Sequence, residues 1–130
     1  MNYLLFFKYT LFVALGGALG AVARFWVAEF THLFFERGFP IGTLIVNVVG
    51  SFLMGLFAIY LFHKLSFNEE LRSFMLIGIL GAFTTFSTFS LDTIELVING
   101  NIGFAVMNVT LSVILCILAA GFGVWLGYRM

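Results

Sequence analysis

Charged residues are scarce in this 130-residue sequence, in which six Lys or Arg and six Asp or Glu make up 9% of the chain. A soluble domain carries roughly 25% charged residues, so this chain lacks the polar surface that water requires. The formal net charge of zero argues against a nucleic-acid partner. The single cysteine, Cys116, cannot form a disulfide within the chain and therefore says nothing about the redox compartment.

Hydrophobic residues make up 62% of the sequence and form long runs. No charged residue interrupts residues 39–62, 73–91 or 102–128. A helix crosses a bilayer core about 30 Å thick with roughly 20 apolar residues, so these runs are long enough to span it. The sequence therefore predicts an all-α membrane protein. It forms one transmembrane domain over residues 1–130, with four spans at about 9–30, 41–62, 73–96 and 102–128.

The connections between the predicted spans carry recognisable turn and helix-start signals. The only proline, Pro40, suits the start of the second span. Ser66 and Glu69 have the spacing of a capping box ahead of the third span. The Asn-Gly-Asn sequence at residues 99–101 predicts a tight turn between the third and fourth spans.

Positive charges are divided unevenly but not decisively between the two sides of the membrane. If all four spans cross, one side carries four basic residues and the other carries two, namely Lys8, Lys64, Arg72 and Arg129 against Arg24 and Arg37. The positive-inside rule places the side richer in Lys and Arg in the cytoplasm. The count slightly favours a cytoplasmic N-terminus and leaves insertion in both orientations open.

Two pairs of glycines indicate close packing between helices. Gly16 and Gly20 form one GxxxG pair, and Gly123 and Gly127 form another. Glycine at this spacing lets helix backbones approach where lipid offers no hydrophobic drive. The sequence leaves open whether these contacts lie within one chain or between chains. Four helices leave little room for a water-filled path, so a transporter of this size is expected to be an oligomer.

Polar residues at membrane depth are informative, because an unsatisfied polar group there costs several kcal/mol. Thr43 and Asn47 in the second span are four residues apart and share a helix face. The amide either joins neighbouring helices by hydrogen bonds or lines a path for a solute. In the fourth span, Asn108, Ser112 and Cys116 repeat every four residues, and the same two interpretations apply to this stripe.

The third span contains the hydroxyl-rich segment TTFSTFS at residues 84–90, with Gly81 ahead of it. Hydroxyl and β-branched side chains compete with helical hydrogen bonding. We therefore expect a break in this helix near residues 81–85. Non-helical backbone at this depth is tolerated only where protein or a cavity covers it. Freed carbonyls there could hold a cation, and freed N–H groups could meet an anion.

Two phenylalanines in this segment, Phe86 and Phe89, are three residues apart and share a helix face. They are either ordinary packing residues or part of an ion path. An aromatic ring is electropositive at its rim, so paired ring edges can line an anion path without a full positive charge. A conduction path must bind its ion firmly enough to remove water and weakly enough to release it. Amide and hydroxyl donors together with ring edges, and no central Lys or Arg, suit a small anion.

Three segments in this order resemble the Fluc (CrcB-like) family of fluoride channels. They are GGALGAVAR at residues 16–24, GTLIVNVVGS at residues 42–51, and Gly81 followed by residues 84–90. The resemblance implies a dual-topology antiparallel homodimer in the cell (plasma or inner) membrane. Such a dimer has two antiparallel pores along the subunit interface and passively exports cytoplasmic fluoride, which relieves its toxicity.

The resemblance also implies roles for individual residues. Those in the fluoride pore are Asn47, Thr43, Phe86, Phe89, Thr88 and Ser112. Arg24 would lie near the pore entrance, although it also suits an interfacial charge that reaches toward water. A structural sodium ion at the dimer centre would be held by backbone carbonyls of Gly81 and Thr84. Two residues depart from the family pattern: Asp92 stands in place of a glutamate and Cys116 in place of a hydroxyl residue.

Three other classes of protein are alternatives to the channel. A small proton-coupled multidrug exporter needs a carboxylate buried in mid-helix, whereas Glu29, Asp92 and Glu95 lie towards span ends. An intramembrane enzyme is not expected, because Ser51 lacks the G-x-S-x-G pattern of a nucleophile elbow. A purely structural membrane subunit stays open.

Overall fold

The computed structural model describes residues 2–35 and 38–130, so Arg37 lies outside the described residues. Four helices are long and apolar enough to cross a membrane, and they cover Tyr3–Phe34, Ile41–Lys64, Glu69–Ile98 and Ile102–Arg129. The prediction of an all-helical chain with four apolar spans is confirmed. The helices extend beyond the predicted apolar runs, because polar side chains outside the hydrocarbon core can be solvated while the helix continues.

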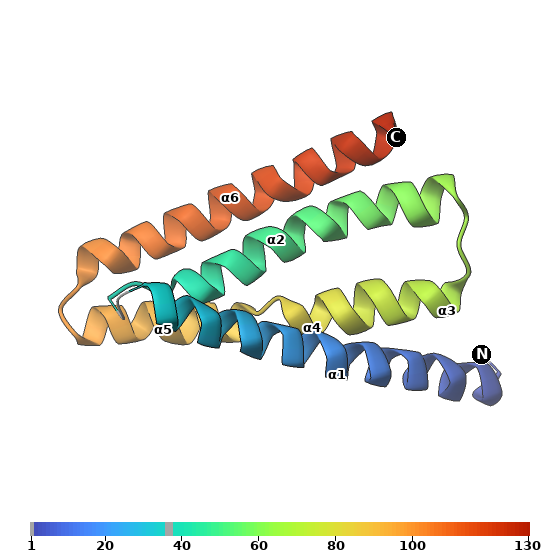
Figure 1. The fold of residues 1–130 in the computed structure, drawn as a ribbon, viewed down its shortest axis with the longest axis horizontal. Helices are drawn as coiled ribbons and strands as arrows, with labels where there is room; N and C mark the ends of the chain where they lie inside the picture. The colour runs from blue at the N-terminus through green and yellow to red at the C-terminus, as the bar shows by residue number, and fades with distance from the viewer. Residues whose placement is uncertain (1, 36–37) are drawn as a thin grey trace.

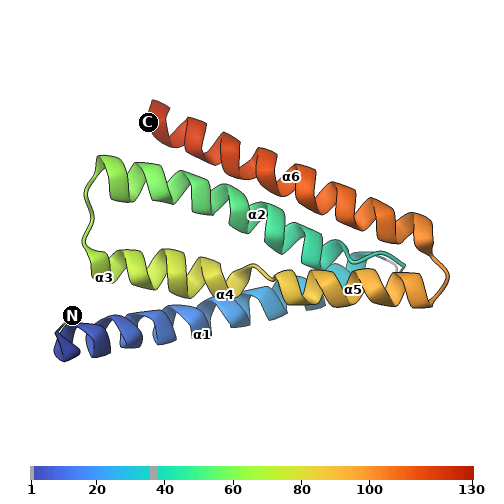
Figure 2. The same cartoon turned by 180° about the vertical axis from the view of Figure 1, so that it is seen from behind.

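The helical elements follow one another with short connections. The first span is α1 (Tyr3–Phe34), and the second joins α2 (Ile41–Phe57) to the π-helical η1 (Ala58–Lys64). The third contains α3 (Glu69–Arg72), the π-helical η2 (Ser73–Leu80), α4 (Gly81–Phe83) and α5 (Phe86–Ile98). The fourth is α6 (Ile102–Arg129). Successive spans run in opposite directions, with α1 beside the third span and α6 beside α2 (Figures 1 and 2).

The glycine pairs allow close packing within this chain. Gly16 and Gly20 of α1 lie against the backbone of η2, where a Cβ atom would meet the carbonyl oxygens of Phe74 and Ile79. Gly123 of α6 lies against the backbone of α2 in the same way. These contacts hold the chain as two helix pairs, α1 with the third span and α2 with α6.

One helix start differs from the sequence-based prediction. The predicted capping box from Ser66 to Glu69 is wrong: α3 is capped by Asn68, whose Oδ1 accepts a hydrogen bond of 3.0 Å from Leu71 N. Ser66 instead has a left-handed φ of 51° in the preceding turn. The predicted turn at residues 99–101 is confirmed, with a φ of 79° at Gly100.

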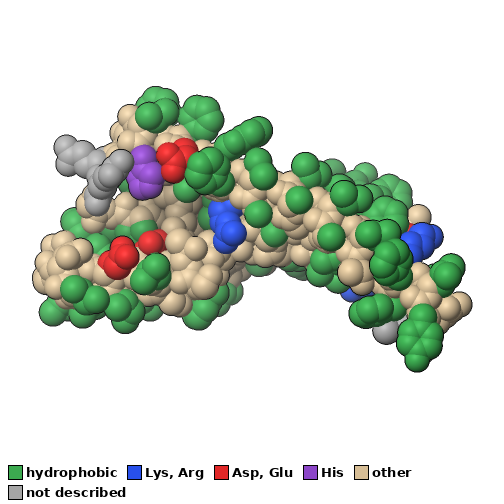
Figure 3. All heavy atoms as spheres, turned by 90° about the horizontal axis from the view of Figure 1, so that it is seen from below, with side chains coloured by type: hydrophobic (Ala, Val, Ile, Leu, Met, Phe, Trp, Pro, Cys, Tyr) green, Lys and Arg blue, Asp and Glu red, His purple; other side chains and the backbone are tan. Residues whose placement is uncertain are grey.

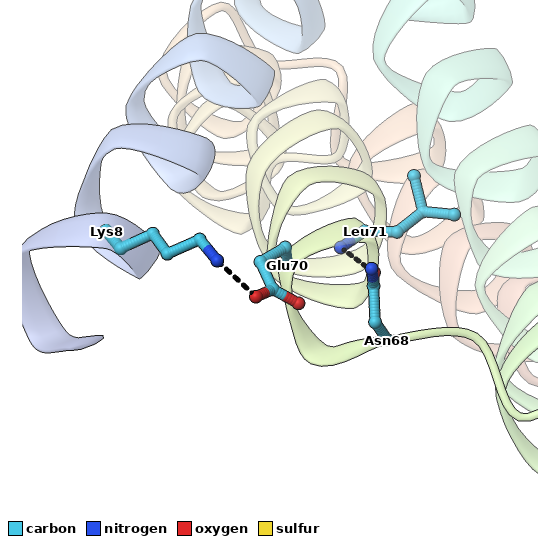
Figure 4. A network of polar contacts seen from close by, with 4 residues as sticks. All are labelled: Lys8, Asn68, Glu70 and Leu71. Carbon is cyan, nitrogen blue, oxygen red and sulfur yellow. Dashed lines mark hydrogen bonds and ion pairs between the residues drawn. The ribbon is translucent and has the colours of Figure 1, made fainter.

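An ion pair joins the first and third spans at the end of the molecule that holds the N-terminus. Lys8 Nζ donates to Glu70 Oε1 at 2.6 Å, next to the Asn68 cap (Figure 4). The Lys8 side chain is half exposed, so the pair contributes little to stability.

Candidate functional site

The third span is interrupted between α4 and α5. Thr84 (φ −81°, ψ 156°) and Thr85 (φ −152°, ψ 119°) are both extended, and the ribbon shows a short non-helical link at this point (Figures 1 and 2). The link lies where the hydroxyl-rich sequence predicts a break, near residues 81–85. The link lies in the middle of the span, where backbone polar groups must find partners inside the protein.

Asn47 supplies those partners for Thr85. Asn47 Nδ2 donates to the Thr85 carbonyl at 2.9 Å, and the Thr85 N–H donates to Asn47 Oδ1 at 2.7 Å. In an uninterrupted helix this N–H would donate to the Gly81 carbonyl. The amide of α2 therefore replaces a helical hydrogen bond of the third span. Of the two interpretations of Asn47, the structure shows the one in which it joins helices, and one N–H of Nδ2 remains beyond this pair.

A glycine on α2 makes room for the link. A Cβ atom at Gly50 would overlap the methyl group of Thr84. The small residue therefore lets α2 approach the extended backbone closely enough for the Asn47 amide to reach Thr85.

Thr85 also starts α5. Its Oγ1 accepts from Thr88 N at 3.1 Å and donates to Thr88 Oγ1 at 3.0 Å, and it lies 3.2 Å from Ser87 Oγ. This is an N-cap, which satisfies one of the free N–H groups of the first helical turn. The positive end of the α5 dipole therefore points toward the link, where it favours negative charge.

A cavity of about 440 Å³ adjoins the link, and we call it the central cavity. Its polar and aromatic lining comprises Asn47, Ser51, Thr84, Thr85, Phe86, Phe89, Ser112 and Cys116. None of the described residues that line it is charged. The rings of Phe86 and Phe89 lie 5.3 Å apart between centroids, at 48° to each other, and Phe86 is 79% exposed. The two rings thus form an open edge of an uncharged, donor-containing cavity.

A second cavity, of about 520 Å³, lies at the end of the molecule where the second span begins, and we call it the outer cavity. Thr43 and Thr88 line it together with four titratable residues, Glu29, His32, Asp92 and Glu95. Acidic and histidine side chains surround a hollow at one end of the molecule in Figure 3. Thr43 Oγ1 donates to Asp92 Oδ2 at 2.6 Å, so the hydroxyl of Thr43 is held by this carboxylate.

The predicted site residues therefore fall into three groups. Asn47, Thr84, Phe86, Phe89 and Ser112 line the central cavity, whereas Thr43 and Thr88 line the outer one. Arg24 and Gly81 are not among the residues that line either cavity. Spacing alone could not separate the first two groups, because Thr43 and Asn47 share one face of α2.

One buried polar chain joins Asn108, which the sequence places in the polar stripe of the fourth span, to Thr93, which the sequence does not single out. Asn108 is fully buried, and its Nδ2 donates to Thr93 Oγ1 at 2.9 Å. Thr93 Oγ1 in turn donates to the Phe89 carbonyl at 2.7 Å. Among the described residues, Asn108 Oδ1 has no partner. A buried acceptor without a partner costs about 1–3 kcal/mol.

Comparison with known proteins places the sequence among named relatives. The family model described as CrcB-like protein, Camphor Resistance (CrcB), matches residues 11–124. A relative from Magnetococcus marinus is 49% identical over 115 residues, which cover 88% of this chain and 94% of the relative. One from Coxiella burnetii is 47% identical over 121 residues, covering 92% and 98%.

A third relative, from Methylococcus capsulatus, is 48% identical over 118 residues, or 91% of this chain. The match spans about half of that relative's length, at 52%. All three relatives carry the name fluoride-specific ion channel FluC.

Proposed function

We propose, since the chain belongs to the CrcB-like protein family, that it is a fluoride-specific ion channel. It is a multi-pass membrane protein that conducts an ion and is not an enzyme. The observation that carries this function is the central cavity. There an amide, a helix N-terminus and two aromatic rings converge, and the lining found among the described residues carries no charged side chain.

These groups suit an ion that is small, hard and strongly hydrated. The remaining N–H of Asn47, the Ser112 hydroxyl and the rims of Phe86 and Phe89 can each face an anion with a partial positive charge. The N-terminus of α5 adds its dipole in the same direction. Neutral donors replace part of the water shell without the strong attraction of a Lys or Arg, which would slow release.

The ion path joins the two cavities. Fluoride passes Thr43 and Thr88 in the outer cavity and Asn47 and Ser112 in the central one, and Arg24 raises the anion concentration near an entrance. The carboxylates of the outer cavity act on the ion through water, where an effective dielectric constant of about 80 makes their repulsion about a quarter of that at the centre of the span. Because the Thr43 hydroxyl donates to Asp92, it must rotate away from the carboxylate before it donates to fluoride. Asp92 thus occupies the only hydroxyl hydrogen of Thr43 until that rotation occurs.

The working unit is a homodimer. Phe86 is 79% exposed beside the non-helical link, where the exposed Gly81 has a carbonyl without its helical donor. Lipid cannot donate a hydrogen bond to this carbonyl, whereas a second copy can cover it. The nearly even division of basic residues is compatible with two copies inserted in opposite orientations. An antiparallel dimer would then hold two pores of opposite direction along its interface.

A sodium ion fits the same link. Among the described residues no three His, Cys, Asp or Glu side chains lie close enough to hold a metal ion, so the ligands would be backbone oxygens. The carbonyl of Gly81 lacks its helical donor because the Thr85 N–H goes to Asn47, and Thr84 is extended. Interrupted helices present such carbonyls to sodium. Gly81 and Thr84 of both copies would hold the ion, which would fix the two links to each other.

In the cell, the channel would lie in the plasma or inner membrane and allow cytoplasmic fluoride to leave passively. A proton-coupled multidrug exporter is not favoured, because its mechanism requires a carboxylate at the centre of the span. The carboxylates of the described residues near the path line the outer cavity instead.

The test is ion efflux from liposomes that contain the purified protein. We expect rapid, electrogenic fluoride efflux without a pH gradient and no comparable chloride efflux. The particle mass in detergent should be twice 14.5 kDa after correction for bound detergent. Fluoride retention by vesicles that contain the assembled dimer, or proton-coupled uptake of cationic drugs, would refute the channel.

A further inference from the structure

The hydrogen-bond chain from Asn108 through Thr93 to the Phe89 carbonyl has a fixed direction. A threonine hydroxyl has one hydrogen, and Thr93 uses it for the Phe89 carbonyl. Its oxygen can therefore only accept from Asn108, which orients the amide with Nδ2 toward Thr93 and Oδ1 away. In this orientation Oδ1 faces away from Thr93, and none of the described residues donates to it.

The chain lies one helical turn from the central cavity on both helices that carry it. Asn108 precedes Ser112 by four residues on α6, and Thr93 follows Phe89 by four residues on α5. Residues four apart lie on the same helix face, so the hydrogen bond between α5 and α6 adjoins the wall formed by Ser112 and Phe89. The cost of the buried, unpartnered Oδ1 exceeds what the neutral hydrogen bond of Nδ2 contributes, so stability alone does not account for the amide.

We propose that Asn108 and Thr93 are positioning residues for the Phe89 ring, which they fix by tying the first turns of α5 to α6. This proposal rests on the channel function. The hydrogen bonds hold the α5 backbone at Phe89 while α5 and α6 diverge toward the link (Figure 1). Without them the ring edge moves relative to Asn47 and Ser112, and the fit to a small anion is lost.

The first test compares Asn108→Leu with wild type. Removing the amide leaves the Thr93 hydroxyl still bonded to the Phe89 carbonyl and removes the unpartnered Oδ1. We therefore expect an equal or higher unfolding temperature of the dimer, together with fluoride flux reduced about fivefold, the factor that corresponds to one neutral hydrogen bond. A purely structural amide predicts the opposite, a lower unfolding temperature with unchanged flux per folded dimer.

The second test uses Thr93, where Thr93→Val removes the hydroxyl at constant volume and Thr93→Ser retains it. Flux should fall in the valine variant and be restored in the serine variant. Thr110→Val is the matched control, since Thr110 is exposed on α6 and its hydroxyl bonds only within that helix, to Val106. Its flux should equal that of wild type.

The third test asks whether the effect passes through the aromatic ring. In a Phe89→Ile background with measurable residual flux, Thr93→Val should cause no further loss. A full additional loss would overturn the proposal. Absence of fluoride flux in the wild type would refute the channel itself, whereas wild-type flux with unaffected Asn108→Leu and Thr93→Val variants would refute only the positioning role.

Discussion

Replacing Asn47 by aspartate changes one donor into an acceptor at the point where α2 meets the interrupted span. The accepting oxygen can still bind the Thr85 N–H, but the second carboxylate oxygen faces the Thr85 carbonyl, with which Nδ2 now forms a 2.9 Å bond. The loss of this bond to a buried carbonyl should lower the free energy of unfolding by about 1–3 kcal/mol.

The same substitution places a negative charge beside the ion path. At about 5 Å and an effective dielectric constant of about 20, repulsion between the carboxylate and fluoride is roughly 3 kcal/mol, or about a hundredfold in occupancy. Fluoride efflux from liposomes should therefore fall about a hundredfold in Asn47→Asp. Asn101→Asp makes the same change at an exposed position outside the path and should leave efflux intact.

Acidification separates the two effects in Asn47→Asp. A protonated carboxyl can donate to the Thr85 carbonyl and restores the pair of bonds, so the thermal stability of the variant in detergent should be highest at acidic pH. It should be lost as the pH rises and the group ionises. Wild-type efflux by this variant, or a stability deficit that does not depend on pH, would refute the reasoning.

Three further predictions concern the central cavity. Phe86→Ile removes the ring edge and should reduce fluoride flux about fivefold while size-exclusion chromatography still shows a dimer; unchanged conductance would reject the role of the ring. Gly50→Ala forces a Cβ atom into the methyl of Thr84 and should lower stability by about 1–3 kcal/mol, whereas Gly121→Ala, which meets open space, should not. A small thiol reagent should slow fluoride flux by modifying Cys116, the only cysteine, and Cys116→Ser should be insensitive to it.

The four spans could be predicted from the sequence because the requirement to cross an apolar layer is written in uninterrupted hydrophobic runs. The ends of the helices could not be predicted from these runs, since a helix continues past the apolar layer until a residue caps it. Asn68 rather than Ser66 caps α3 because Ser66 takes a left-handed turn conformation. Local spacing shows which residues are able to cap, but the path of the preceding loop decides which one does.

The sequence was sufficient to single out several residues of the site, but not to show which groups they bind. The rule that buried polar groups need partners singled out Asn47, yet its actual partner, the backbone of Thr85, lies 38 residues away in the chain. Helical spacing groups Thr43 with Asn47, whereas in the structure the Thr43 hydroxyl donates to Asp92 and lines the outer cavity. Thr93 gave no signal of its own, since a threonine four residues after a phenylalanine is common.

The arrangement at the link implies that one amide serves both structure and conduction. Asn47 holds the extended backbone through its carbonyl oxygen and one N–H of its amino group, both of which bind Thr85. A single N–H is then left for an ion. A lone neutral donor binds weakly, so the path must combine it with ring edges and the start of α5 to compensate for dehydration. Conduction by weak, distributed donors therefore requires each of them to be held rigidly. The hydrogen bonds of Asn47 provide that rigidity on one side of the central cavity, as we infer that those of Asn108 and Thr93 do on the other.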